Sequence, residues 1–134
     1  DYRAEAMKIL QEEAQLDEIV RLVGIDALSP KDRLTMEVAK SLREDYLHQN
    51  AFHEIDTYSS MKKQYLMLKL MIGYYSEANE ALKRDCSLDD ILSIPAREQI
   101  GRSKYIEEVE LSKFDEIDSA VRSQLSALKA KEIF

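Results

Sequence analysis

Residues 59–84 read SSMKKQYLMLKLMIGYYSEANEALKR, and this stretch decides the fold class of the chain. Its apolar side chains recur in steps of three and four, which is the spacing of one face of an α-helix. They are Met61, Tyr65, Leu68, Ile72, Tyr75 and Leu82, with Asn79 in the remaining turn. The pattern predicts one long helix from Ser59 or Ser60 to Arg84, in which Gly73 allows a neighbouring helix to pack closely.

Two further helices are predicted before this stretch. The first covers residues 2–23 and ends at Gly24, a residue type that commonly follows a last helical turn. Its predicted apolar face consists of Met7, Leu10, Leu16, Ile19, Val20 and Val23. The second covers residues 30–48, with Ser29 as its N-cap and Pro30 at the first helical position. Its apolar stripe consists of Leu34, Val38, Leu42 and Tyr46.

Shorter elements follow the long helix. Ser87 is the N-cap of a short helix that ends before Pro95, and Pro95 begins another that ends near Ser103. A last helix is predicted over residues 107–131, with Phe114, Ile117, Val121, Leu125 and Leu128 in register. Because no strand pattern appears, we expect an all-α fold, a helical bundle of about four main helices plus short connecting helices.

Composition excludes several classes of partner. The 134 residues carry a net charge of −7, and an acidic surface repels nucleic-acid phosphates and anionic lipids. We therefore expect no nucleic-acid partner and no direct membrane contact. The single cysteine, Cys86, cannot form an internal disulfide, which suits a reducing compartment. The chain opens without Met, directly in a helical pattern, as expected of a piece of a longer polypeptide.

No complete catalytic or metal site is predicted within the chain. His53 and Glu54 begin like a zinc-protease motif, but Thr57 stands where its second histidine belongs, and His48 does not share a helical face with His53. Cys86 has no histidine near it in sequence, so an unreactive thiol is favoured over a nucleophile. The three glycines are far apart and none precedes a lysine, which excludes a phosphate-binding loop. We therefore expect no catalytic residue, no metal and no cofactor in this fragment itself.

Residues 7–52 read MKILQEEAQLDEIVRLVGIDALSPKDRLTMEVAKSLREDYLHQNAF. This stretch resembles the C-terminal region of the catalytic A subunits, or alpha chains, of archaeal-type and V-type rotary ATPases. The resemblance continues through residues 53–58 and 63–65, is weaker over residues 91–105, and fades in the last helix. It implies that residues 1–134 form a single C-terminal helical bundle domain, a fragment of a longer catalytic subunit whose nucleotide-binding domain is absent here.

A more distant similarity, to the beta subunits of bacterial and mitochondrial synthases, implies a contact with the central stalk. A loop of those subunits that reads DELSEED touches the rotating shaft. By position it matches Asp26, Ala27, Leu28, Ser29, Pro30, Lys31 and Asp32. Because Ala27, Pro30 and Lys31 replace acidic residues of that loop, the similarity implies contact through shape, at Leu28 and the helix cap, rather than through a dense acidic patch.

The same similarity implies an adenine contact. The aromatic residue of a QPF motif helps to line the adenine pocket in those subunits, and its counterpart here is Phe52, in the block Gln49, Asn50, Ala51, Phe52. An aromatic face stacks on a base without requiring hydrogen bonds. The alternative role for Phe52 is to pack the connector onto the bundle.

The resemblance also implies a division of labour. ATP or ADP with Mg²⁺ would bind mainly in the upstream domain of the intact subunit, whereas this domain acts as a lever that couples ATP hydrolysis or synthesis to stalk rotation and to proton or sodium transport. The implied partners are the non-catalytic B subunit and the central-stalk subunit, at the cytoplasmic periphery of a membrane-bound complex. The alternative is a free-standing helical adaptor without enzymatic activity. A B subunit is disfavoured by the LREDYL and QNAF blocks.

Overall fold

The computed structural model describes residues 1–47 and 60–131, and within these ranges it contains helices and no strand. The α-helices are α1 (Tyr2–Val23), α2 (Pro30–Ser41), α5 (Met61–Lys83), α6 (Leu88–Leu92), α7 (Pro95–Arg102) and α8 (Lys113–Ser126). The 3₁₀ turns are η1 (Ile25–Ala27), η3 (Ser103–Tyr105) and η4 (Glu108–Glu110), and η2 (Leu42–Leu47) is a π-helix that continues α2. The predicted all-α bundle is confirmed.

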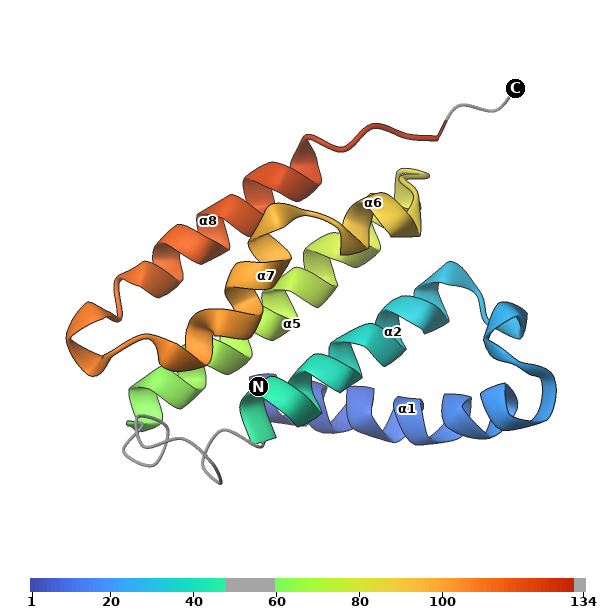
Figure 1. Ribbon diagram of the computed structural model, residues 1–134, viewed down its shortest axis with the longest axis horizontal. Coiled ribbons are helices and arrows are strands. Elements are labelled where there is room, and N and C mark those ends of the chain that lie inside the picture. The colour runs from blue at the N-terminus through green and yellow to red at the C-terminus, as the bar shows by residue number, and fades with distance from the viewer. Residues whose placement is uncertain (48–59, 132–134) are drawn as a thin grey trace.

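Helix α5 is the centre of the bundle (Figure 1). It packs against α8 on one side and against α1 and α2 on the other, while α6 and α7 cross beside it. Its buried side chains lie on more than one face; they are Lys63, Met67, Leu68, Leu70, Met71, Ile72, Tyr74, Ala78 and Ala81. Because α5 is buried on several faces, the one apolar stripe predicted from the sequence includes only some of its buried residues. Met61 and Tyr65 of the predicted stripe are exposed, whereas Met67, Leu70, Met71 and Tyr74 are buried.

Serine residues begin three of the helices as the sequence predicts. Ser29 accepts a hydrogen bond from the amide of Asp32, Ser60 from that of Lys63, and Ser87 from that of Asp90. Each bond satisfies one of the amides that a first helical turn leaves without an internal partner. Their O–N distances are 3.2, 3.0 and 3.1 Å, respectively.

The predicted apolar face of the first helix is only partly confirmed. Leu10 packs against the core, and Leu16 and Val20 are half-buried. Met7, Ile19 and Val23 are exposed, and the buried side chains of α1 are Ala6 and Ile9. Both buried residues lie in the first half of α1, whose first residue, Tyr2, meets Tyr65 of α5 with ring centroids 5.6 Å apart. The second half of α1 therefore carries apolar side chains that the bundle does not cover.

The last helix is shorter than predicted. It begins at Lys113 rather than near residue 107, and it ends at Ser126, beyond which the amide of Lys131 bonds to the carbonyl of Asp85 at 2.9 Å. Residues 108–110 form η4 instead, and the carboxylate of Glu108 is directed to the start of α5. The predicted register is confirmed at Phe114, Ile117, Val121 and Leu125, which are buried.

The structure does not support the predicted packing role of Gly73. A Cβ atom added at Gly73 would meet the Oδ1 atom of Asp118 at 3.6 Å, an ordinary van der Waals distance. The neighbouring helix therefore leaves room for a methyl group. Gly24 differs, because its φ of 91° is a conformation that side chains with a Cβ rarely adopt.

Candidate functional site

The turn between α1 and α2 forms one end of the bundle, and we call residues 24–32 the tip (Figure 1). Gly24 ends α1, with its amide bonded to the carbonyl of Val20 at 2.9 Å. Asp26 in η1 accepts a hydrogen bond of 3.0 Å from the guanidinium of Arg33 in α2. The Ser29 cap then starts α2. These contacts connect η1 to the ends of α1 and α2 that flank it.

Within the tip, Leu28 points inward, with only 7% of its surface exposed. It anchors the tip to the bundle, so its side chain does not offer the shape contact that the sequence suggested. Of the other residues compared with the stalk-contacting loop, Asp26, Ala27, Ser29, Pro30 and Lys31 are exposed and Asp32 is half-buried. The exposed part of the tip is therefore mixed in charge rather than acidic.

Exposed apolar side chains adjoin the tip, and we call Leu22, Val23 and Ile25 the apolar rim. Leu22 is 84% exposed and Val23 is 66% exposed, and Ile25 follows Gly24 directly. Clustered exposed apolar residues mark interaction sites more often than single ones do. Sequence reasoning missed the rim because Val23 was assigned to the core face of the first helix.

The residues predicted to contact adenine, Gln49, Asn50 and Phe52, lie outside the described residues, as do His48 and His53. Described residues on either side of this stretch make polar contacts with residues 104 and 108. On the N-terminal side, the Asp45 carboxylate accepts a hydrogen bond of 3.1 Å from the Nζ atom of Lys104. On the C-terminal side, the amide and the hydroxyl of Ser60 both donate to the Glu108 carboxylate, each at 2.7 Å.

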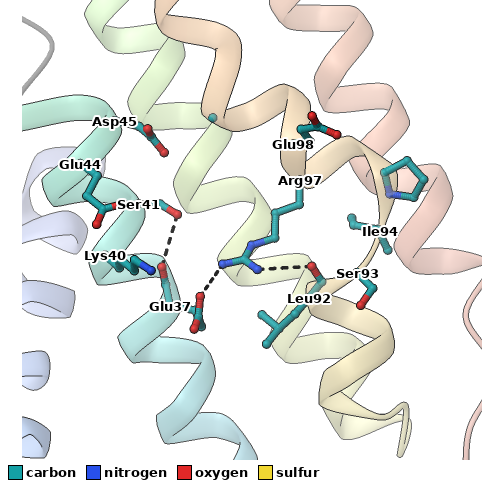
Figure 2. Close-up of a pocket in the computed structure, with 12 residues that line it drawn as sticks. Glu37, Lys40, Ser41, Glu44, Asp45, Leu92, Ser93, Ile94, Arg97 and Glu98 are labelled. Atoms are coloured by element: carbon teal, nitrogen blue, oxygen red, sulfur yellow. Dashed lines mark hydrogen bonds and ion pairs between the residues drawn. The ribbon is translucent and has the colours of Figure 1, made fainter.

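A polar cleft of about 460 Å³ lies between η2 and α2 on one side and α7 on the other (Figure 2). Arg97 reaches into it and donates to the Glu37 carboxylate at 2.6 Å and to the carbonyl of Leu92 at 3.3 Å. Four carboxylates line it, from Glu37, Glu44, Asp45 and Glu98, together with the cations Lys40 and Arg97. Acidic groups outnumber basic ones in this lining, which disfavours binding of a phosphate group.

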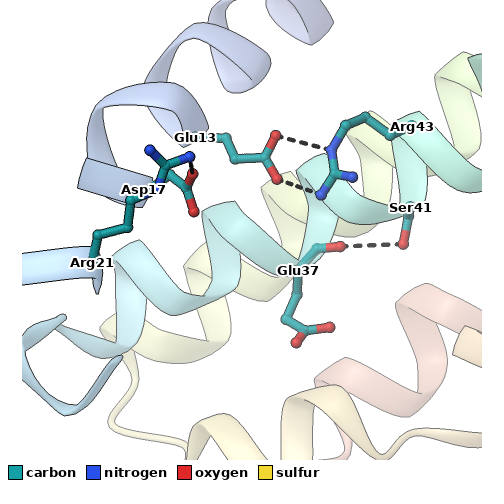
Figure 3. Close-up of polar contacts among 6 residues, drawn as sticks. All are labelled: Glu13, Asp17, Arg21, Glu37, Ser41 and Arg43. Carbon is teal, nitrogen blue, oxygen red and sulfur yellow. Dashed lines mark hydrogen bonds and ion pairs between the residues drawn. The ribbon is translucent and has the colours of Figure 1, made fainter. Parts of the chain in front are cut away.

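One ion pair joins α1 to η2, the segment that continues α2 (Figure 3). The guanidinium of Arg43 in η2 donates to both oxygens of the Glu13 carboxylate, at 3.0 and 2.6 Å. This hydrogen bond, together with the negative charge of Glu13, raises the pKa of Arg43. The bidentate pair fixes the relative position of α1 and η2 better than a single contact would.

Metal and thiol chemistry find little support in the described part of the chain. Among residues 1–47 and 60–131, no three His, Cys, Asp or Glu side chains gather closely enough to hold a metal ion. Cys86 is buried, and its Sγ atom lies 3.6 Å from the carbonyl oxygen of Leu128. A search of the same residues finds no helix long and apolar enough to cross a membrane.

Comparisons with known proteins all point to one family of ATP synthase subunits. Residues 1–92 match the family described as the C-terminal domain of V and A type ATP synthase. The V-type ATP synthase alpha chain of Acetivibrio thermocellus is 58% identical over 132 residues, which cover 98% of this chain and 22% of that protein. That of Thermoanaerobacter pseudethanolicus is 58% identical over 128 residues, which cover 96% and 22%. That of Clostridium botulinum is 64% identical over 116 residues, which cover 86% and 20%. The chain thus spans about a fifth of the length of these curated relatives.

Proposed function

The chain belongs to the family of C-terminal domains of V and A type ATP synthases, and from this membership we propose that it is the lever domain of the ATP-binding catalytic subunit of such a complex. In this role it couples ATP hydrolysis or synthesis in the intact subunit to rotation of the central stalk, and so to proton or sodium transport. The apolar rim beside the tip is the structural observation that carries the proposal.

The shape of the bundle supports a lever. Helix α1 runs from the start of α5, where Tyr2 meets Tyr65, to the tip (Figure 1). At 1.5 Å per residue its 22 residues are about 33 Å long. The Arg43–Glu13 and Arg97–Glu37 pairs tie α2 and η2 to α1 and α7. A closely packed body of this kind transmits displacement from one end to the other.

We assign the central-stalk contact to the exposed residues of the tip together with the apolar rim. An apolar surface of a few side chains suits a partner that slides past it, because it makes no directional bonds that must break at each step. Asp26 and Lys31 add one charge of each sign at its edge. The other proposed neighbour is the non-catalytic B subunit, in a peripheral, cytoplasmic part of a membrane-bound complex.

We also propose that Phe52, with Gln49 and Asn50, forms the edge of the adenine pocket of the intact subunit. This proposal is supported by the similarity of the Gln49–Phe52 block to the adenine-contacting motif of related subunits. ATP or ADP with Mg²⁺ would then bind chiefly to the part of the subunit outside this chain. Residues 1–134 would supply one aromatic face to it and none of the phosphate ligands.

The experiment that tests the lever role compares two sets of exposed apolar residues in the intact, vesicle-reconstituted complex. One variant carries L22S, V23S and I25S in the apolar rim. The matched control carries M61S and V109S, whose native side chains are 86% and 87% exposed at the opposite end of the bundle. ATP hydrolysis and ion transport are measured on the same preparation.

We expect the rim variant to hydrolyse ATP but to transport several-fold fewer ions per ATP, whereas the control keeps the native ratio. The substituted side chains are exposed, so the fold should tolerate both sets of changes. A native transport ratio in the rim variant, or an equal loss in the control, would contradict the proposal.

A further inference from the structure

The chain beyond α8 runs past the turn that joins α5 to α6, and we call residues 127–131 the strap (Figure 1). Near its start, the carbonyl of Leu128 accepts hydrogen bonds from the Arg84 guanidinium at 3.3 Å and from the Cys86 thiol at 3.6 Å. At its end, the amide of Lys131 donates to the carbonyl of Asp85 at 2.9 Å. Three consecutive residues of the turn after α5 therefore hold the strap.

The turn that holds the strap is fixed by hydrogen bonds of its own. The amide of Asp85 donates to the carbonyl of Leu82 at 3.0 Å, and the amide of Cys86 donates to the carbonyl of Ala81 at 3.1 Å. These two bonds form a Schellman motif at the C-terminal end of α5, in which Asp85 takes the left-handed position with a φ of 66°. Neither bond involves the strap, so the turn does not depend on the strap for its shape.

The strap packs little against the core of the bundle. Leu128 is half-buried and contacts the core, whereas Ala127 and residues 129–131 are exposed. The buried side chains of α8 end at Leu125, before the strap begins. Segments that have few buried apolar contacts open locally at a lower free-energy cost than the core does. The strap is therefore held mainly by its hydrogen bonds to the turn after α5, and its release does not require α8 to unpack.

The closed strap covers the thiol of Cys86, which is only 2% exposed and lies against the backbone of Leu128. Arg84 supports this arrangement with a second bond, of 2.9 Å, to the carbonyl of Leu125 at the C-terminal end of α8, where a positive charge is favoured. We infer that the strap opens and closes over Cys86 while the helices stay folded, and that Arg84 keeps it closed. The closed strap ties α8 to the turn between α5 and α6, and opening releases this tie.

The first test measures how fast N-ethylmaleimide labels Cys86 in the intact subunit, by mass spectrometry of the peptide that contains this residue. When the strap closes faster than the reagent reacts, the labelling rate is proportional to the open fraction. R84A removes two hydrogen bonds to the end of α8 and the strap, so it should raise the rate roughly three- to tenfold. The matched control K83A removes a neighbouring exposed cation that pairs with Glu80 within α5, and it should be labelled at the native rate. A native rate in R84A would overturn the role of Arg84.

The second test removes the hydrogen bond at the other end of the strap. Proline has no amide hydrogen, so K131P deletes the donor to the Asp85 carbonyl and should raise the labelling rate of Cys86 roughly two- to fivefold. The matched control K131A loses the same side chain but keeps the amide, so it should be labelled at the native rate. Equal rates in the two variants would show that this bond does not hold the strap closed.

The dependence of labelling on urea separates opening of the strap from unfolding of the whole bundle. Opening the strap exposes little surface, so the labelling rate of Cys86 should stay nearly constant at low urea concentrations. It should rise steeply only where unfolding of the bundle becomes the faster route, in the native protein and in R84A alike. A steep rise from the lowest urea concentrations would mean that the thiol reacts only through global unfolding, and separate opening of the strap would be ruled out.

Discussion

The phenol of Tyr74 donates a hydrogen bond of 3.0 Å to the backbone carbonyl of Ile91, and so joins the middle of α5 to α6. Both residues are buried. Burial of the phenol raises the pKa of Tyr74 to about 12, with a smaller opposing effect from the nearby charge of Arg97. The bond therefore exists only while Tyr74 is neutral, which makes this contact sensitive to alkaline pH.

We expect Y74F to cost about 0.5–1.5 kcal/mol of unfolding free energy at neutral pH, because the Ile91 carbonyl loses its donor. The folded pKa of about 12 lies above the unfolded value of 10, so the stabilisation is complete below pH 10 and is lost between pH 10 and 12. Urea unfolding at a series of pH values measures both effects. In Y74F the unfolding free energy should no longer fall between pH 10 and 12 through this group. In Y105F, where the tyrosine replaced is exposed, the fall should remain.

We expect G24A to destabilise the domain by roughly 1–2 kcal/mol, because a φ of 91° brings a Cβ atom close to the following backbone. Nothing else crowds the site, since an added Cβ would find no neighbouring atom within 4 Å. The cost would therefore arise from backbone strain alone. Thermal unfolding of the variant measures it, and an unchanged midpoint would show that the turn after α1 accepts another conformation.

In contrast, we expect G73A to stabilise the domain. Gly73 lies inside α5, where alanine favours the helix by about 0.5–1 kcal/mol, and an added Cβ meets only the Asp118 carboxylate, at an ordinary distance. The variant should raise the free energy of unfolding by about that amount in urea titrations. A loss of stability would mean that α5 and α8 approach each other more closely here than the structure indicates.

The hydrogen bonds between Ser60 and Glu108, at the start of α5, should weaken in acid. The amide and hydroxyl of Ser60 lower the pKa of Glu108, and Lys63 adds a smaller effect in the same direction. A lowered folded pKa means that the stabilisation is present above the unfolded value and is lost as pH falls through the folded value. The amide resonance of Ser60 should therefore shift in acid as Glu108 is protonated. In E108Q that shift should be absent, and an identical shift in E108Q would assign it to another group.

Local chemistry made much of the fold predictable. The caps at Ser29, Ser60 and Ser87 and the stop at Gly24 depend only on neighbouring residues, so the sequence located these helix boundaries to within one or two positions. The buried register of α8 was also predictable, because one face of it meets α5.

Contacts between distant segments were not predictable in this way. The bonds from Ser60 to Glu108 and from Lys104 to Asp45 join residues 48 and 59 positions apart, and no local pattern indicates them. The start of the last helix was placed too early, in a stretch where the chain forms the 3₁₀ turn η4. The exposure of Val23 depends on how far α1 extends past its neighbours, which periodicity does not report.

The π-helix over residues 42–47 has a consequence for how this chain tolerates changes of length. A π turn holds one residue more than an α turn, so deleting a single residue there could leave an ordinary helix with the same start and end. The side chains before the turn and those at its end would then keep their directions, because the extra residue is accommodated within the π turn itself. This turn is thus a place where loss of one codon costs the chain little alignment.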